Sequence, residues 1–132
     1  MKKILFILSM LFIAACSQVD SDIQRINCKR THLINTGMKL VLKADNENDT
    51  EMKNIAICFT ATMYEIDKDS LKRAANSESV EKKLMWDILV SCQNKVKNLT
   101  NKEFVAMSQN ALKASNLSKQ HESCFNDKGE SK

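Results

Sequence analysis

The chain has 132 residues, of which 20 are Lys or Arg and 16 are Asp or Glu, so its formal net charge at pH 7 is +4. Without Lys2 and Lys3 the balance is 18 basic against 16 acidic residues, which lacks the strong basic excess of a nucleic-acid-binding domain. The chain has no proline and 2 glycines, whereas hairpin-rich β domains need such residues in their turns. Composition therefore predicts an all-α fold that binds no nucleic acid.

The N-terminal segment has the pattern of a signal peptide. Lys2 and Lys3 precede an apolar run from Ile4 to Ala15, in which Ser9 is the one polar residue. A positive start, a short apolar run and small residues before the cleavage point are typical of such peptides. The run is shorter than the roughly 20 apolar residues that a membrane-spanning helix needs. We therefore expect residues 1–15 to be a cleaved signal peptide.

The end of this run, Ile13-Ala14-Ala15-Cys16, resembles the lipobox of bacterial lipoproteins. The resemblance implies that Cys16 becomes the first residue of the mature protein and receives a diacylglycerol and further acyl chains such as palmitate. Two or more chains hold a protein stably, at about 0.8 kcal/mol per buried methylene. Ser17 follows the cysteine, which implies sorting to the outer membrane, facing the periplasm. The alternative is an ordinary secretory signal that is cleaved near Ala15.

The rest of the chain is expected to form a single domain. The 117 residues after the signal suffice for one hydrophobic core but hardly for two. Residues 16–22 form a polar, lipidated tether, which spans about 20 Å when fully extended. Residues 23–125 form the helical domain, and the polar residues 126–132 are expected to be disordered.

Apolar periodicity predicts a bundle of about four helices. The predicted helices cover Val19–Ala44, with an interruption at Asn35–Gly37 as an open alternative, Glu51–Asp67, Val80–Asn98, and a segment that starts at Thr100. Residues 51–67 also alternate like a strand, but a lone strand would have no partner in this chain. A short helical turn is expected after Asp69, and a second one near His121 and Cys124.

Polar residues mark the ends of these helices. The run Asp45–Thr50 predicts a connection, and Ser77 and Ser79 are candidate N-caps for the third helix. Thr100 and Glu103 have the spacing of a capping box at the start of the last helix. That helix is expected to direct five apolar side chains inward, namely those of Phe104, Val105, Met107, Ala111 and Leu112.

Besides Cys16 the chain has four cysteines, and an even number in a small exported domain predicts disulfides. If the four helices run alternately up and down, Cys58 and Cys92 come to similar heights on neighbouring helices. Cys28 and Cys124 then meet at one end of the bundle, whereas Cys92 and Cys124 lie near opposite ends. We therefore predict the pairs Cys58–Cys92 and Cys28–Cys124.

The sequence offers little for catalysis. His32 and His121 are the two histidines, neither lies in a recognisable catalytic motif, and His32 is expected to face solvent. The spacing of His121 and Cys124 is compatible with metal ligation, but an oxidised Cys124 would supply no thiolate. We therefore expect a protein that is not an enzyme and that has no metal, no cofactor and no small-molecule substrate.

The third helix carries the candidate partner-binding residues. Trp86 lies about 200° around the helix from Leu84, off the centre of the apolar face. Val90 is one turn further along, and Lys82 and Lys83 are one turn before. An exposed aromatic residue with a basic rim is typical of protein-binding hot spots. A tryptophan buried in the core is the competing and preferred interpretation, because tryptophan is usually largely buried.

A small helical domain on a short lipid anchor, without a catalytic set, is most simply an interaction module of the bacterial envelope. Its layout is broadly similar to that of helical pilotins, lipoproteins that escort a secretin subunit to the outer membrane. Immunity or exclusion lipoproteins, which neutralise an incoming effector or conjugation partner, are the alternative, and a small envelope enzyme is a third. A pilotin should offer an apolar groove to one amphipathic helix, whereas an immunity protein often meets its target through complementary charge.

Overall fold

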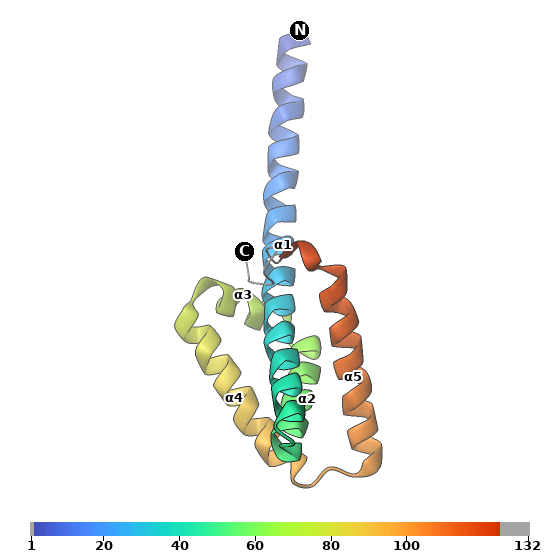
Figure 1. Ribbon diagram of the computed structural model, residues 1–132. Coiled ribbons are helices and arrows are strands. Elements are labelled where there is room, and N and C mark those ends of the chain that lie inside the picture. The colour runs from blue at the N-terminus through green and yellow to red at the C-terminus, as the bar shows by residue number, and fades with distance from the viewer. Residues whose placement is uncertain (1, 125–132) are drawn as a thin grey trace.

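The computed structural model describes the backbone of residues 2–124 and the side chains of residues 23–121, 123 and 124. It consists of five α-helices and one 3-10 turn (Figure 1). These elements are α1 (Lys2–Asn46), α2 (Thr50–Glu65), α3 (Lys68–Asn76), α4 (Glu78–Val96), α5 (Asn101–Gln120) and η1 (Glu122–Cys124). Residues 2–124 contain no strand. The prediction of a small all-α bundle with two disulfides is confirmed.

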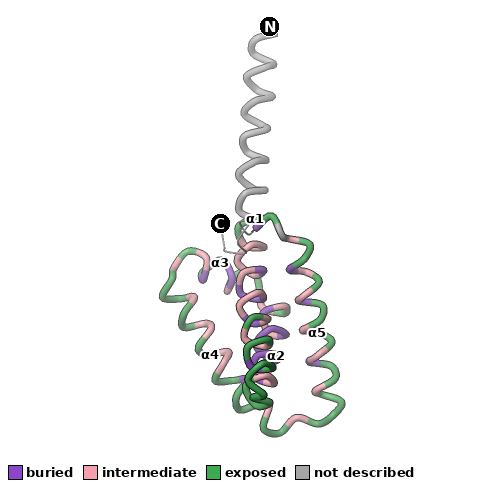
Figure 2. The backbone as a smooth tube through the Cα atoms, viewed as in Figure 1, coloured by how far each residue is buried: buried purple, intermediate pink, exposed green. Residues whose placement is uncertain are grey.

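Helix α2 is the centre of the bundle. It packs against α1, α4 and α5, while α3 packs against α1 and α4. Figure 1 shows α4 and α5 on opposite sides of α2, and α1 extends beyond the bundle. The buried positions in Figure 2 follow from this arrangement, because α2 is covered on several sides and the outer faces of α4 and α5 are open to solvent.

The hydrophobic core joins α1, α2 and α3. Its largest fully buried side chains are those of Phe59, Leu33, Ile34, Met63 and Leu71. A second cluster of buried residues lies toward the other end of α2, where Ile55 and Met107 pack beside the sulfur atoms of Cys58 and Cys92. The segment that could also have been a strand is thus helical as far as Glu65, two residues before the predicted end at Asp67, and it supplies residues to both clusters.

The helix ends follow the polar residues that the sequence indicated. Ser77 caps α4 by accepting a hydrogen bond from the Val80 amide, and Thr100 caps α5 by accepting one from the Glu103 amide at 3.1 Å. The Thr100 hydroxyl also donates to the Glu103 carboxylate at 3.1 Å. Such N-caps satisfy backbone donors that have no partner within the helix. The turn expected after Asp69 is a full short helix, α3, capped by Asp67.

Helix α1 is continuous through Gly37, so the alternative of an interruption at Asn35–Gly37 is wrong. The glycine serves close packing. A Cβ atom at Gly37 would clash with Oγ1 of Thr60 and would lie 2.9 Å from Cδ1 of Phe59. Glycine therefore lets α1 approach α2 closely, which tertiary packing favours despite the low helix propensity of this residue.

Both predicted disulfides are present. Cys28 on α1 is bonded to Cys124 in η1, with 5.3 Å between their Cα atoms. Cys58 on α2 is bonded to Cys92 on α4, with 5.7 Å between their Cα atoms. One bridge therefore ties the end of α5 to α1, and the other ties α4 to the central helix.

Two predicted core positions on α5 are wrong. Val105 is 53% exposed and Leu112 is 63% exposed. Helix α5 packs mainly against α2 and α1, and it buries a narrow stripe, centred on Met107, Ala114 and Ser118. The predicted tail, residues 126–132, lies outside the described residues, as do the side chains of the predicted signal and tether.

Candidate functional site

Trp86 lies on the outer face of α4 and is 68% exposed. The interpretation of Trp86 as a core residue is therefore wrong. Helix α4 packs on α2 and α3 through its opposite side. Trp86 and Val90 are therefore left at the surface, and Val90 is 39% exposed. The side chains that α4 directs inward are those of Met85, Ile88, Leu89 and Cys92.

The lysines beside Trp86 are engaged in ion pairs on the same helix. The Nζ atom of Lys82 lies 3.2 Å from a carboxylate oxygen of Glu78, and that of Lys83 lies 3.7 Å from one of Asp87. All four side chains are exposed, so each pair contributes little to stability. The pairs nevertheless balance the charge locally. The Trp86 surface, meaning Trp86, Val90, Lys82 and Lys83, is therefore aromatic but close to neutral.

A second apolar surface, which the sequence did not indicate, lies between α1 and α5. It is a groove of about 230 Å³, lined by Met38, Val41, Leu42, Ile57, Thr60 and Ala111. Helices α1 and α5 supply the walls and α2 supplies the floor. Leu42, on the α1 wall, is 64% exposed, and Leu112, which follows the lining residue Ala111 in α5, is 63% exposed.

The fold explains the shape and the apolar character of this groove. Gly37 brings α1 close to α2, and the Cys28–Cys124 bridge holds α5 to α1 at one end. The hydroxyl of Thr60, the one polar side chain of the lining, donates to the carbonyl oxygen of Ala56 at 2.8 Å. Because this donor is satisfied within its own helix, the groove presents a largely apolar surface.

A contrasting polar cleft of about 270 Å³ lies among α2, α4 and α5. Its walls carry Glu65, Lys95, Glu103 and Asn110, and the Asn110 amide donates to the Glu65 carboxylate at 2.8 Å. Cys58 lies in this cleft, but its sulfur is bonded to Cys92, so it is not available as a thiolate nucleophile.

The two histidines lie in different surroundings. His32 is half-buried, which corrects the expectation that it faces solvent. Burial is the main cause that lowers the pKa of His32, and Lys29 and Lys39 lower it further, while Glu81 opposes them. His121 caps α5, and its neighbour Cys124 is bonded to Cys28. That bond removes the thiolate that the metal interpretation of His121 and Cys124 required.

Among the described residues, no group of three or more His, Cys, Asp or Glu side chains is placed to hold a metal ion. None of the helices in the described part of the chain is both long enough and apolar enough to cross a membrane. No protein-family model, curated protein or solved structure matches the chain.

Proposed function

We propose that this chain is a lipid-anchored, non-catalytic protein-binding module of the bacterial outer membrane, and that it binds a helix of another envelope protein in the groove between α1 and α5. The observation that carries the proposal is the groove itself, an apolar surface with Leu42 exposed on one wall. Exposed apolar patches on small domains commonly mark interaction sites.

The form of the groove favours a helix as its occupant. Two helices form the walls and a third forms the floor, an arrangement that accepts the apolar face of an amphipathic helix. Its volume of about 230 Å³ is below the roughly 300–1,000 Å³ of typical small-molecule sites. A few large apolar side chains from a docked helix suit this space better than a cofactor does.

The anchor comes from the lipobox-like residues Ile13 to Cys16. A small helical bundle on a lipid anchor, with a groove for one helix, is similar in layout to the pilotins. An immunity or exclusion lipoprotein remains the alternative, and the identity of the captured partner separates the two. A secretin or another assembly component supports the first role, and an incoming effector or conjugation protein supports the second.

Partner recovery from membranes tests the binding role. The full chain is purified from detergent-solubilised membranes of its own cells, in parallel with Leu42→Asp, Leu112→Asp and, as a matched control, Trp86→Asp. Leu42, Leu112 and Trp86 are all exposed, so the three variants should fold like the parent. We expect one partner to be lost from both leucine variants and kept by the Trp86 variant. Equal recovery with all variants, or loss with the Trp86 variant alone, would refute the groove as the site.

Mass spectrometry of the membrane-extracted protein tests the anchor. We expect an N-terminal Cys16 that carries acyl chains, and we expect Cys16→Ser to release the protein from the membrane fraction. Two acyl chains provide most of the attachment, so a Cys16→Ser protein that is cleaved normally and stays fully bound would contradict the anchor.

A further inference from the structure

We propose that the helix bound in the groove is acidic, with an apolar face that covers Leu42, Ile57 and Ala111 and with carboxylates along its edges that meet Lys39 on α1 and Lys119 on α5. This inference rests on the proposed function and names the chemical class of its partner.

The first argument is the charge of the two walls. Between Ile23 and Ala44, α1 contains no Asp or Glu, and α5 contains none between Phe104 and His121. The same two stretches carry seven basic residues, Arg25, Lys29, Arg30, Lys39, Lys43, Lys113 and Lys119. These stretches of α1 and α5 therefore carry an excess of positive charge, although Lys29 is paired with Glu81 and Arg30 donates to the main chain of α2.

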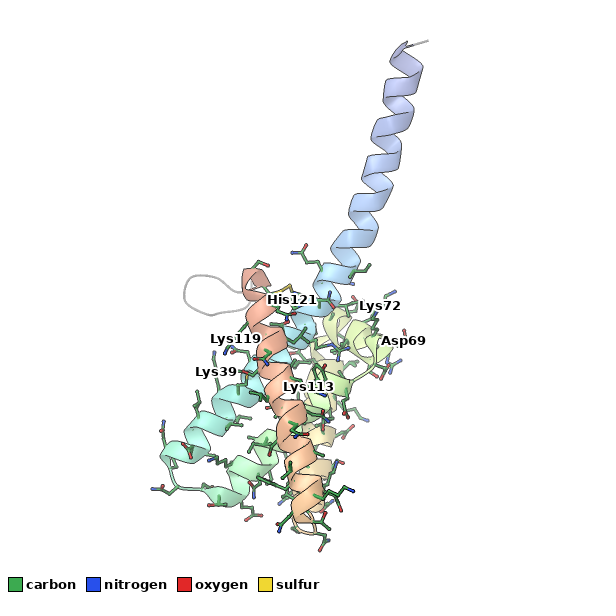
Figure 3. All side chains as sticks on the ribbon, turned by 90° about the vertical axis from the view of Figure 1, so that its right-hand side faces the viewer. Lys39, Asp69, Lys72, Lys113, Lys119 and His121 are labelled. Atoms are coloured by element: carbon green, nitrogen blue, oxygen red, sulfur yellow. A yellow bond between two sulfur atoms is a disulfide. The ribbon has the colours of Figure 1, made fainter. Side chains whose placement is uncertain are left out.

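The second argument is where the lysines lie. Lys39 precedes Leu42 by three residues and Lys119 follows Leu112 by seven, and both spacings place the two side chains on one side of their helix. Figure 3 shows Lys39 on α1 and Lys119 on α5. Each of the two helices thus presents an exposed leucine, Leu42 in the groove lining and Leu112 next to the lining residue Ala111, with a lysine on the same stripe.

The third argument is that Lys39 and Lys119 have no carboxylate partner among residues 23–121. The nearest acidic residue on the α1 wall, Asp45, accepts a hydrogen bond from Lys53 at 2.8 Å. On the Trp86 surface, by contrast, Lys82 and Lys83 each have an acidic partner. A partner with carboxylates gains attraction at the groove that the Trp86 surface does not offer.

An anionic lipid, like an acidic helix, combines negative charge with an apolar surface. The shape of the groove favours the helix. The groove is an open surface between two helices that ends in exposed side chains, whereas a bound acyl chain is usually enclosed on most sides. The open shape matches a cylinder about 10–12 Å wide that lies along the walls.

Two model peptides test the inference with the full chain in detergent micelles. They share one apolar face, with leucines at positions i, i+3, i+4 and i+7, and differ in their edges, which carry Glu in one and Lys in the other. Fluorescence anisotropy should show the Glu peptide binding about tenfold more tightly at low salt, because opposite charges attract and like charges repel. The difference should shrink near 1 M salt, where the Debye length falls to about 3 Å.

Charge-reversal variants locate the effect. We expect Lys39→Glu combined with Lys119→Glu to reverse the preference for the Glu peptide. Lys72→Glu combined with Lys97→Glu, which makes the same change of charge at exposed positions on α3 and after α4, should leave it intact. Leu42→Asp should weaken the binding of both peptides.

The other outcomes contradict the inference. Equal binding of both peptides, a preference that survives the Lys39/Lys119 reversal, or no binding of the Glu peptide would overturn the acidic helix. Displacement by phosphatidylglycerol micelles with no binding of the Glu peptide would identify an anionic lipid as the ligand. None of these results would refute the binding role itself, because partner recovery with the Leu42 and Leu112 variants tests that role independently.

Discussion

The groove between α1 and α5 and the Trp86 surface on α4 are two apolar surfaces of one small bundle, but they differ in shape and charge. The groove is concave, and Lys39 and Lys119, on the two helices that form its walls, have no carboxylate partner among residues 23–121. The Trp86 surface lies on the outside of a single helix, and its lysines are paired with Glu78 and Asp87. An exposed aromatic residue alone therefore identifies a binding surface less well than a concave apolar surface with unbalanced charge.

The difference follows from how the outer helices are attached. Helix α4 is tied to α2 in its second half by the Cys58–Cys92 bridge. Helix α5 is tied to α1 at its end, through Cys28–Cys124, and it packs on α2. The groove lies between α1 and α5, so changes that loosen α5 should affect the groove more than the Trp86 surface.

The largest effect is expected from removing the Cys28–Cys124 bridge. This bridge spans 96 residues of sequence, and closing a loop of about 100 residues corresponds to roughly 4.7 kcal/mol in the chain-entropy model. Cys28→Ser combined with Cys124→Ser should lower the free energy of unfolding by about this amount and should increase hydrogen exchange in the last turns of α5. Urea denaturation and amide exchange measure the two effects. Faster amide exchange in α4, with exchange in α5 unchanged, would contradict the claim that this bridge holds the α5 wall of the groove.

Truncating Phe59 and Trp86 compares the core with the Trp86 surface. Phe59 is fully buried, so Phe59→Ala should lower the free energy of unfolding by about 3–5 kcal/mol. Trp86 is largely exposed, so Trp86→Ala should change it by less than about 0.5 kcal/mol. Chemical denaturation of both variants gives the comparison. A loss of several kcal/mol in Trp86→Ala would show that Trp86 is a core residue.

A smaller effect is expected at Gly37, below the groove. At an exposed position inside a helix, replacing Gly by Ala stabilises the helix by about 1 kcal/mol. Here the added methyl group would clash with Oγ1 of the buried Thr60, and overpacking of this kind costs about 1–3 kcal/mol. We expect Gly37→Ala to lower the melting temperature, and Gly37→Ala combined with Thr60→Ala to recover part of the loss. A rise in melting temperature for the single variant would show that α1 and α2 are less tightly packed there.

The smallest effect concerns His32 and pH. Burial and the nearby Lys29 and Lys39 lower the pKa of His32 in the fold, with Glu81 opposing them, whereas the unfolded chain has a pKa near 6.5. The unfolded state therefore binds more protons, so the free energy of unfolding should fall as pH drops below about 6.5. Denaturation curves between about pH 8 and pH 5.5 should show this decline in the parent and a flatter profile in His32→Gln. Identical pH profiles in the parent and in His32→Gln would exclude His32 as the cause of the decline in stability.

Much of the fold follows from local sequence signals. Ser77 and Thr100 mark helix starts because their side chains accept hydrogen bonds from specific backbone amides. The pairing of Cys58 with Cys92 and of Cys28 with Cys124 follows from the heights of the four cysteines along the helices. Such signals depend on position within one helix, or on the order of the helices, and both can be read from the chain.

The groove and the Trp86 surface depend on the distances between the helices, and the pattern of apolar residues does not determine these distances. Val105 and Leu112 lie on the face of α5 opposite to the buried Met107 and Ala114, so they are exposed although they are apolar. A buried Trp86 is expected because tryptophan is usually largely buried, but this tendency does not indicate which face of α4 the other helices cover. The absence of acidic residues from 23–44 and from 104–121 was visible in the sequence, but it became informative once α1 and α5 were seen to form the two walls of one groove.

Site-specific photo-crosslinking in intact cells is the most direct test of the account. A photoreactive phenylalanine analogue replaces Leu112 in one strain and Trp86 in another, in the full, membrane-attached protein. Leu112 and Trp86 are similarly exposed, so general accessibility does not separate them. The account predicts one discrete protein adduct from position 112, which disappears when Lys39→Glu and Lys119→Glu are added, and no matching adduct from position 86. The same adduct from position 86 alone, or a lipid adduct in place of a protein from position 112, would contradict it.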